Sequence, residues 1–176
     1  MTQDLYKTVT SHWVAPTEFP NIEGRVAIDL ETCDPDLIKH GPGWPTKKGK
    51  VIGIAIATAS FKAYYPIAHE GGGNMDRRMV LNWLQDQMNT DSIKIFHNAM
   101  YDVCWLRKLG INIKGQIVDT MIAASLVDEN RFRYDLNGLS RDYLGKGKDE
   151  TVLQETAKSW GVDPKAEMYK LPAMYV

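Results

Sequence analysis

The sequence predicts an α/β fold in which a mixed sheet carries helices on its faces, and two observations lead to this prediction. Three short runs rich in β-branched and aromatic residues stand close together between residues 25 and 67. From residue 76 onward, helical periods alternate with short apolar runs. Closely linked strands favour antiparallel neighbours, and the alternation that follows them favours helices packed against the same sheet.

The predicted strands are apolar runs bounded by turn-forming residues. The first reads RVAIDL, the second VIGIAIAT and the third KAYYPI, with Pro66 near its end in a position that suits an edge strand. A fourth run, IKIF, is short and fully apolar but for one lysine, and a fifth alternates only loosely. The Gly- and Pro-rich residues 33–50 predict a loop. The five strands are expected at 25–30, 51–58, 62–67, 93–96 and 111–118.

The predicted helices show apolar residues at helical spacing. Val80, Leu84 and Met88 recur at every fourth position, as on one face of an amphipathic helix. Gly110 and Gly145 end two of the later segments, in the position that a helix C-terminus favours. The five helices are expected at 76–88, 98–109, 119–127, 135–144 and 149–159.

Length and composition predict one globular domain. The chain has 176 residues, of which 44% are hydrophobic, and its net charge is −1, so a disordered or strongly basic protein is excluded. No apolar run approaches the roughly 20 residues that a membrane span needs. Cys33 and Cys104 show no disulfide or zinc spacing. We expect an extended arm over residues 1–24 and one domain over 25–176.

Two acids close the first predicted strand. Asp29 and Glu31 stand two residues apart, so in a strand their side chains point to the same face. Carboxylates that close repel each other, which raises a pKa unless a positive charge lies between them. Hard cations such as Mg²⁺ or Mn²⁺ prefer oxygen ligands and meet that need. The same pattern also fits a strand end that turns into solvent.

A second polar group follows the fourth predicted strand, in the run FHNAMYD. His97 and Asn98 come directly after the strand, and Asp102 lies near the start of the next helix. Asn98 suits a helix N-cap, Asp102 suits the positive end of the helix dipole, and His97 suits a buried structural histidine. Ligands also bind at the carboxyl ends of strands. If this strand runs parallel to the first, Asp102 approaches Asp29 and Glu31.

Together these residues carry a resemblance to a known family. The run Asp29-Leu-Glu-Thr32 at a strand end, followed by His97-Asn-Ala-x-Tyr-Asp102 at a helix start, resembles the first two motifs of the DEDD 3′–5′ exonucleases. The closest likeness is to the proofreading domain of family A DNA polymerases, especially those of phages. Later segments, Asp119-Thr-Met and LNGLSRDYLG, extend the likeness over nearly the whole chain.

The resemblance implies a ribonuclease H-like fold and hydrolysis of the 3′-terminal phosphodiester with two metal ions, Mg²⁺ or Mn²⁺. It implies that Asp29, Glu31 and Asp102 are catalytic residues and metal ligands. The substrate-binding residues that it implies are Leu30, Thr32, His97 and Asn98. The implied partners are a single-stranded DNA 3′ end and a polymerase domain, in cis or in trans, and no membrane. The implied location is the cytoplasm, that of the host cell if a phage encodes the chain.

One part of the family pattern is missing from these 176 residues. No tyrosine has an aspartate four positions later, and the one His-x-x-x-x-Asp, at His97 and Asp102, coincides with the second motif. We therefore expect a truncated or separately encoded N-terminal piece. A second hypothesis is a catalytically impaired module that binds a DNA end or a partner, and a third is a fragment that needs a second chain with the Tyr-x-x-x-Asp motif. The acids that could in principle substitute are Asp119, Asp135, Asp142 and Asp149, although helix caps or solvated acids are the simpler interpretation.

Overall fold

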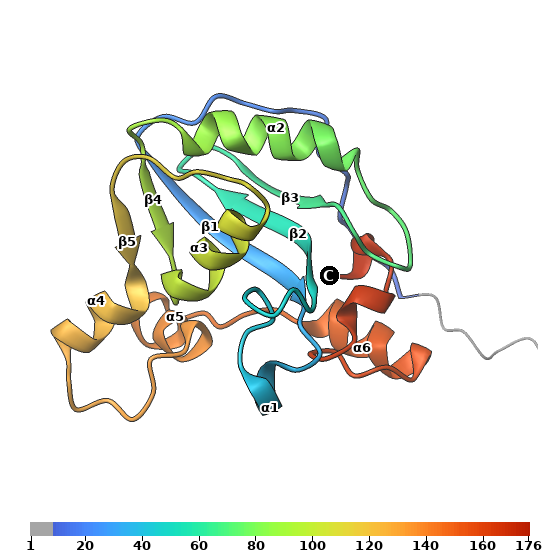
Figure 1. Ribbon diagram of the computed structural model, residues 1–176. Helices are drawn as coiled ribbons and strands as arrows, with labels where there is room; N and C mark the ends of the chain where they lie inside the picture. The colour runs from blue at the N-terminus through green and yellow to red at the C-terminus, as the bar shows by residue number, and fades with distance from the viewer. Residues whose placement is uncertain (1–8) are drawn as a thin grey trace, which may run out of the picture.

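The computed structural model describes residues 9–176 and contains one five-stranded mixed sheet in the order β3-β2-β1-β4-β5 (Figure 1). β1 pairs antiparallel with β2, and β2 pairs antiparallel with β3. β1 pairs parallel with β4, and β4 pairs parallel with β5. The predicted mixed sheet is therefore confirmed, as is the parallel orientation of the first and fourth predicted strands. The strands are β1 (Arg25–Cys33), β2 (Lys50–Ala57), β3 (Lys62–Pro66), β4 (Ile93–Phe96) and β5 (Ile117–Asp119).

The helices agree with the predicted segments to within two residues at either end. A one-turn helix, α1, and two short 3₁₀ turns, η1 and η2, add to the five that the periodicity predicted. The helices are α1 (Leu37–His40), α2 (Arg77–Met88), α3 (Ala99–Lys108), α4 (Thr120–Val127), α5 (Leu136–Leu144), α6 (Thr151–Trp160), η1 (Met168–Lys170) and η2 (Ala173–Tyr175).

The hydrophobic core lies on one face of the sheet. Val26, Ile28 and Leu30 alternate along β1 and are almost fully buried, as period-two burial of one face requires. They belong to one cluster with side chains of β2, β3, α2 and α3, among them Leu84 and Leu106. The alternate residues of β1 point to the opposite face. That face carries Asp29 and Glu31, so the pattern that buries the core also places the two acids side by side on the other face.

The segment before β1 runs alongside α2 (Figure 1). Phe19 packs against Tyr65 and Trp83, with ring centroids 5.4 and 5.5 Å apart. The Trp83 indole N–H donates to the carbonyl oxygen of Pro20 over 3.0 Å, and the Ile22 N–H donates to the side chain of Gln87 over 2.8 Å. Residues 9–24 form no helix or strand. The boundary of the predicted arm stays a prediction, and its residues 1–8 lie outside the described part of the chain.

The strand predicted at 111–118 is mostly wrong, since only Ile117–Asp119 pairs with the sheet. Ile111 is buried and Ile113 partly buried, so their apolar character serves core packing from a loop. Gly115 has φ +82°, and a Cβ there would lie 2.8 Å from the carbonyl oxygen of Ser92. After this turn, pairing with β4 begins at Ile117. The loose alternation of apolar residues at 111 and 113 therefore reflects their burial in a loop and does not indicate a strand.

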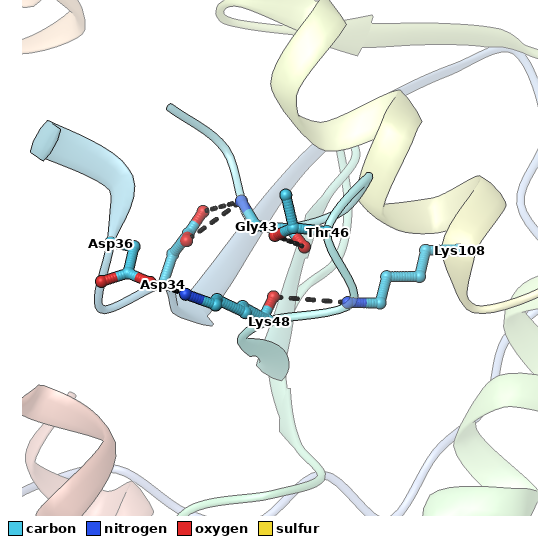
Figure 2. A network of polar contacts seen from close by, with 6 residues as sticks. All are labelled: Asp34, Asp36, Gly43, Thr46, Lys48 and Lys108. Carbon is cyan, nitrogen blue, oxygen red and sulfur yellow. Dashed lines mark hydrogen bonds and ion pairs between the residues drawn. The ribbon is translucent and has the colours of Figure 1, made fainter. Parts of the chain in front are cut away.

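Polar contacts of Asp34, Asp36 and Lys108 hold the predicted loop at 33–50 (Figure 2). Both carboxylate oxygens of Asp34 accept a hydrogen bond from the Gly43 N–H, over 3.1 and 3.0 Å. Lys48 forms an ion pair with Asp36 over 2.7 Å, and the ammonium of Lys108 donates to the carbonyl oxygen of Lys48 over 3.4 Å. The loop is thereby tied to α3, which carries the second predicted motif.

Two expectations about composition can be compared with the structure. Cys33 and Cys104 are both free thiols, in agreement with the absence of a disulfide pattern. Among residues 9–176, no helix combines the length and the apolar character that crossing a bilayer requires.

Candidate active site

Asp29 and Glu31 lie at the carboxyl-terminal half of β1, next to an irregularity in the sheet. Asp29 pairs with Ala55 and Glu31 pairs with Gly53, whereas the next residue, Thr32, pairs with Val51. One residue of β2, Ile52, is thus left over, and its carbonyl oxygen accepts hydrogen bonds from the amides of residues 67 and 68. Such a bulge bends the strand and changes the direction of nearby side chains. Glu31 sits where this change occurs.

Asp102 reaches the same region from α3. β4 runs parallel to β1, so both strands end at the same edge of the sheet, and α3 starts directly after β4. Asp102 lies in the first turn of α3 and is only 3% exposed. Its carboxylate accepts a backbone hydrogen bond from Leu30, the residue between Asp29 and Glu31. The structure therefore brings the acids of the two predicted motifs together.

Burial raises the pKa of all three carboxyl groups, and the charge of Asp29 raises those of the other two further. Burial, and then the charge of Asp29, raise the pKa of Glu31 from 4.5 to about 7. Burial, and then Asp29, raise the pKa of Asp102 from 3.8 to about 7, against the lowering effect of the Leu30 hydrogen bond. Burial also raises the pKa of Asp29, which Lys148 and His97 partly offset. Partly desolvated like charges of this kind are uncommon unless a cation is to be bound.

The donor set has the chemistry of a hard-cation site, although its geometry is not that of a preformed one. In the described part of the chain, no three His, Cys, Asp or Glu side chains converge as metal ligands do. The three carboxylates nevertheless offer only oxygen atoms, which Mg²⁺ and Mn²⁺ prefer. A bound dication would also offset the energetic cost of keeping these partly buried carboxylates ionised. The residues fit such a metal on the basis of charge and ligand type.

His97 is held by one ring nitrogen and leaves the other free. The Thr120 hydroxyl donates to the carbonyl oxygen of Phe96 over 3.0 Å, so its oxygen accepts from His97 Nδ1 over 2.9 Å. His97 Nε2 is buried and has no hydrogen-bond partner among the described residues. His97 and Asp29 line the same apolar hollow, which we call the trough. Nδ1 therefore has a structural partner, and the residue as a whole also lines the hollow beside Asp29.

The expected N-cap role of Asn98 is wrong. Asn98 is the N-cap residue by position, but its side chain makes no capping hydrogen bond, and its backbone is left-handed at φ 68° and ψ 56°. Asp119 takes that role instead, because its carboxylate accepts from the N–H groups of Asn98 and Ala99 over 3.1 and 2.7 Å. The exposed amide of Asn98 is left available for a ligand. A non-glycine residue in this conformation is often found at functional sites.

The remaining predicted substrate-binding residues have different surroundings. The hydroxyl of Thr32 is 2.8 Å from that of Tyr101, which also donates to Asp34 over 3.0 Å. The side chain of Leu30 is 6% exposed and packs in the core. Only the backbone of Leu30 therefore belongs to the site, where it meets Asp102.

The four acids considered as substitutes for the missing ligand all have structural partners. Asp119 also accepts from the Met121 N–H over 2.9 Å at the start of α4, and Asp135 accepts from the Gly138 N–H over 2.9 Å at the start of α5. Asp149 accepts from the Thr151 N–H over 3.1 Å, and Asp142 forms an ion pair with Arg131. Helix capping and surface pairing thus account for them.

Sequence reasoning missed the residues that approach Glu31 from the last third of the chain. Glu31, Lys148 and Glu150 line one pocket of about 400 Å³, together with residues of α5 and α6. Lys148 lowers the pKa values of Asp29 and Glu31, whereas Glu150 raises that of Glu31. The lysine follows Gly-Lys-Gly, a run that reads as an ordinary loop. No spacing in the sequence links it to residue 31.

A second hollow, the trough, lies over the face of the sheet that carries Asp29. It has a volume of about 570 Å³, and its lining is mostly apolar. The lining includes small residues of β1 and β2 and the larger Trp13, Tyr64 and Leu136. Asp29 therefore borders the apolar trough, and Glu31 borders the pocket that Lys148 and Glu150 also line.

Comparisons with known proteins agree with this arrangement. A family model described as 3′-5′ exonuclease matches residues 16–173. The chain belongs to the 3′–5′ exonuclease family of family A DNA polymerases. It is 39% identical to a DNA-directed DNA polymerase of Pseudomonas phage M6, over 98% of this chain and 27% of that protein. The chain therefore spans about a quarter of the length of this relative.

Solved structures share the fold of this exonuclease family member. Brucella melitensis NrnC with bound Mg²⁺ matches with a TM-score of 0.53 and 17% identity, over 86% of this chain and 84% of that one. Escherichia coli RNase D, an exoribonuclease, matches with a TM-score of 0.52 and 12% identity, over 83% of this chain and 34% of that one. The expected ribonuclease H-like fold is thereby confirmed.

Proposed function

We propose that this exonuclease domain removes nucleotides from the 3′ end of single-stranded DNA, as the proofreading part of a DNA polymerase. The observation that carries the proposal is the approach of Asp29, Glu31 and Asp102 from two motifs about 70 residues apart, in a chain of the exonuclease family. The net charge of −1 is compatible with this, because the site would hold cations on carboxylates and needs few phosphate contacts.

The three acids would hold the metal ions, Mg²⁺ or Mn²⁺. The charge of Asp29 raises the pKa of both Glu31 and Asp102, so Asp29 interacts with each of the other two acids. We therefore assign it as the shared ligand. When bound, two such ions would polarise the attacking water and stabilise the leaving 3′ oxygen. The Mg²⁺ bound to the structurally similar NrnC supports this choice of cation.

The substrate end would lie against the residues around the acids. Thr32 and the exposed amide of Asn98 would offer hydrogen bonds to the terminal nucleotide, and His97 lines the trough together with Asp29. The backbone at Leu30 would lie against the terminal sugar or base. The polymerase domain and a cytoplasmic location, that of the host cell for a phage protein, belong to the same proposal.

The test is release of mononucleotides from 3′-labelled single-stranded DNA with Mg²⁺ or Mn²⁺. We expect Asp29→Ala to reduce the rate by a factor of about 100 or more, because a metal ligand is removed. Asp149→Ala is the matched control, since that exposed acid accepts a hydrogen bond from the Thr151 N–H just before α6 and is not among the residues that line the trough or the pocket. Equal rates for wild type and Asp29→Ala would refute the proposal.

A second candidate function is an exonuclease-like module that binds a DNA end or a partner and cleaves only with a complementing segment. The observations that favour it are the absence of a Tyr-x-x-x-Asp motif from the sequence and the open apolar trough beside Asp29. A chain bearing that motif and the polymerase should raise cleavage when mixed with this one. Turnover by this chain alone that the second chain leaves unchanged would argue against it.

A further inference from the structure

Positive charge is concentrated in one segment of this nearly neutral chain. Residues 37–69 contain five lysines and no aspartate or glutamate, so all 22 acidic residues lie elsewhere. Four of these lysines stand on the segment that leads from β1 into β2. We call this segment the basic loop and define it by Lys39, Lys47, Lys48 and Lys50. A local excess of positive charge attracts polyanions even when the net charge of the chain is slightly negative.

The basic loop returns to the edge of the sheet where the candidate active site lies. Cys33, the last residue of β1, pairs with Lys50, the first residue of β2. Because residues along a strand are about 3.3 Å apart and paired strands about 5 Å apart, the Cα atoms of Lys50 and Glu31 are roughly 10 Å apart. Burial raises the pKa of the Cys33 thiol, and the charge of Lys50 acts against it. Positive charge therefore acts on the end of the strand that carries the acids.

Hydrogen bonds fix the start of this segment relative to both acidic motifs. The Tyr101 hydroxyl donates to the carboxylate of Asp34 over 3.0 Å and is 2.8 Å from the hydroxyl of Thr32. Thr32 follows Glu31 in the chain, and Tyr101 precedes Asp102. One tyrosine thus joins the two motifs to the beginning of the loop, which is thereby held in place beside the acids.

The far end of the basic loop is also fixed, while its lysines stay on the surface. Lys108 Nζ donates to the carbonyl oxygen of Lys48 over 3.4 Å (Figure 2). All four loop lysines are exposed. Lys48 pairs with Asp36 over 2.7 Å, but a surface pair of this kind is weak and can be exchanged for a pair with a phosphate. Among residues 9–176, Lys39 and Lys47 have no ion-pair partner.

We propose that the basic loop binds the phosphates of the DNA strand upstream of its 3′-terminal nucleotide. This inference rests on the proposed exonuclease function, which puts the 3′ end at the acids. The strand behind that end carries one negative charge per nucleotide and needs a path away from the carboxylates. The basic loop offers that path, because it lies at the same edge of the sheet and presents exposed ammonium groups. Phosphate contacts carry no sequence information, which suits removal of any 3′ nucleotide.

The first experiment measures binding in EDTA, where no cleavage occurs. Fluorescence anisotropy with a single strand of about 12 thymidine nucleotides is recorded over a range of salt concentrations for Lys48→Gln and for Lys114→Gln. The two lysines are matched, since each side chain is 60% exposed and pairs with one aspartate. Lys114 lies before β5, at the opposite edge of the sheet.

We expect Lys48→Gln to weaken binding roughly 3- to 10-fold at low salt and to reduce the exponent of the salt dependence by about 0.7, the value for one phosphate contact on a single strand. Lys114→Gln should leave both quantities near those of wild type. An equal loss in the two variants overturns the proposal, because binding would then respond only to the net charge.

A second variant separates the charge of the loop from its folding. The backbone of Lys47 is left-handed at φ 59°, a conformation that asparagine tolerates better than most residues. Lys47→Asn therefore removes a charge without adding backbone strain, and its melting temperature should equal that of wild type. We expect the same loss of affinity as for Lys48→Gln. Salt exponents that are equal in wild type and both loop variants overturn the proposal.

The second experiment locates the contact on the strand. In strands of about 12 nucleotides, one phosphate at a time is replaced by a neutral methylphosphonate, and cleavage is measured with Mn²⁺, so that the 3′ end sets the register. We expect a neutral linkage upstream of the scissile phosphate to raise the DNA concentration for half-maximal rate in wild type and to have a smaller effect in Lys48→Gln. Strands of about three nucleotides should not distinguish the two proteins.

The outcomes separate the two proposals. Neutral linkages that weaken wild type and Lys48→Gln equally overturn the role of the basic loop, and cleavage that still depends on Asp29 then leaves the exonuclease proposal intact. Equal rates for wild type and Asp29→Ala refute the exonuclease proposal, and the upstream strand as ligand of the basic loop with it.

Discussion

At the scale of single residues, Glu31 and Asp102 make the stability of the metal-free protein depend on pH. Their pKa values are about 7 in the folded chain, whereas unfolded carboxyl groups titrate near pH 4. Between these values the folded state holds protons that the unfolded state has released. The free energy of unfolding should therefore fall as the pH rises from about 4 to about 7, and stay low above that.

Chemical denaturation in a chelating buffer at several pH values checks this prediction. Glu31→Gln and Asp102→Asn remove the titrating groups and should each flatten the decline. Added Mg²⁺ should stabilise wild type above pH 7 more than either variant, because a ligand that binds only the folded state raises its stability. A wild-type profile that rises between pH 5 and 7 would contradict the raised pKa values.

Asn98 offers a separate test of backbone strain and ligand binding. Its left-handed backbone costs a residue with a Cβ roughly 1 kcal/mol, and asparagine tolerates this conformation better than alanine. We expect Asn98→Ala to destabilise the fold by about 1 kcal/mol and Asn98→Gly to stay near wild type. Both variants lack the amide, so an equal loss of affinity for a DNA 3′ end in both would identify a side-chain contact. Anisotropy with a labelled oligonucleotide measures it.

At the scale of elements, Asp119 joins the starts of two helices. Burial alone would raise its pKa, but the backbone amides of α3 and α4 that donate to it lower the pKa overall. Its stabilising effect is therefore present above about pH 4 and is lost as the pH falls through the lowered pKa. An aspartate at this position does for α3 what the sequence had suggested for Asn98.

We expect Asp119→Ala to destabilise the protein at pH 7 by about 1–2 kcal/mol, the usual range for loss of a cap. Asp149→Ala, which removes a carboxylate bonded to one amide at an exposed helix start, should cost less. Thermal unfolding at pH 7 and at strongly acid pH separates the cases. A penalty for Asp119→Ala that persists undiminished when the carboxyl group is protonated would argue against a charge-assisted cap.

The sequence predicted best those helices and strands whose apolar residues recur at a regular spacing. The first four strands and the five longer helices were placed to within a few residues, because burial of one face imposes a spacing that the sequence must show. Residues 111–118 failed this test because a loop can also bury Ile111 and Ile113. The bulge between β1 and β2 had no signal, since it arises from the pairing of two distant strands.

At the scale of the whole molecule, the segment before β1 helps to close the core. Phe19 contacts both Tyr65 of β3 and Trp83 of α2, so it joins two elements that already pack together. We expect Phe19→Ala to lower the free energy of unfolding by about 2 kcal/mol, less than a fully buried phenylalanine would lose. Val14→Ala, at a side chain 80% exposed, should change it little. Equal denaturation midpoints for the two variants would mean that the segment does not contribute to the core.

The sequence by itself determined the fold class and the family, because both depend on local patterns: alternating burial, helical periods and two short acidic motifs in order. It also determined that Asp29 and Glu31 share a face, since that follows from the period of a strand. Only the tertiary structure decided which residues surround them. The order of the two motifs already predicted the approach of Asp102, whereas Tyr64 of β3 and Lys148 of the loop before α6 reach this region through chain packing over distances that no local pattern records.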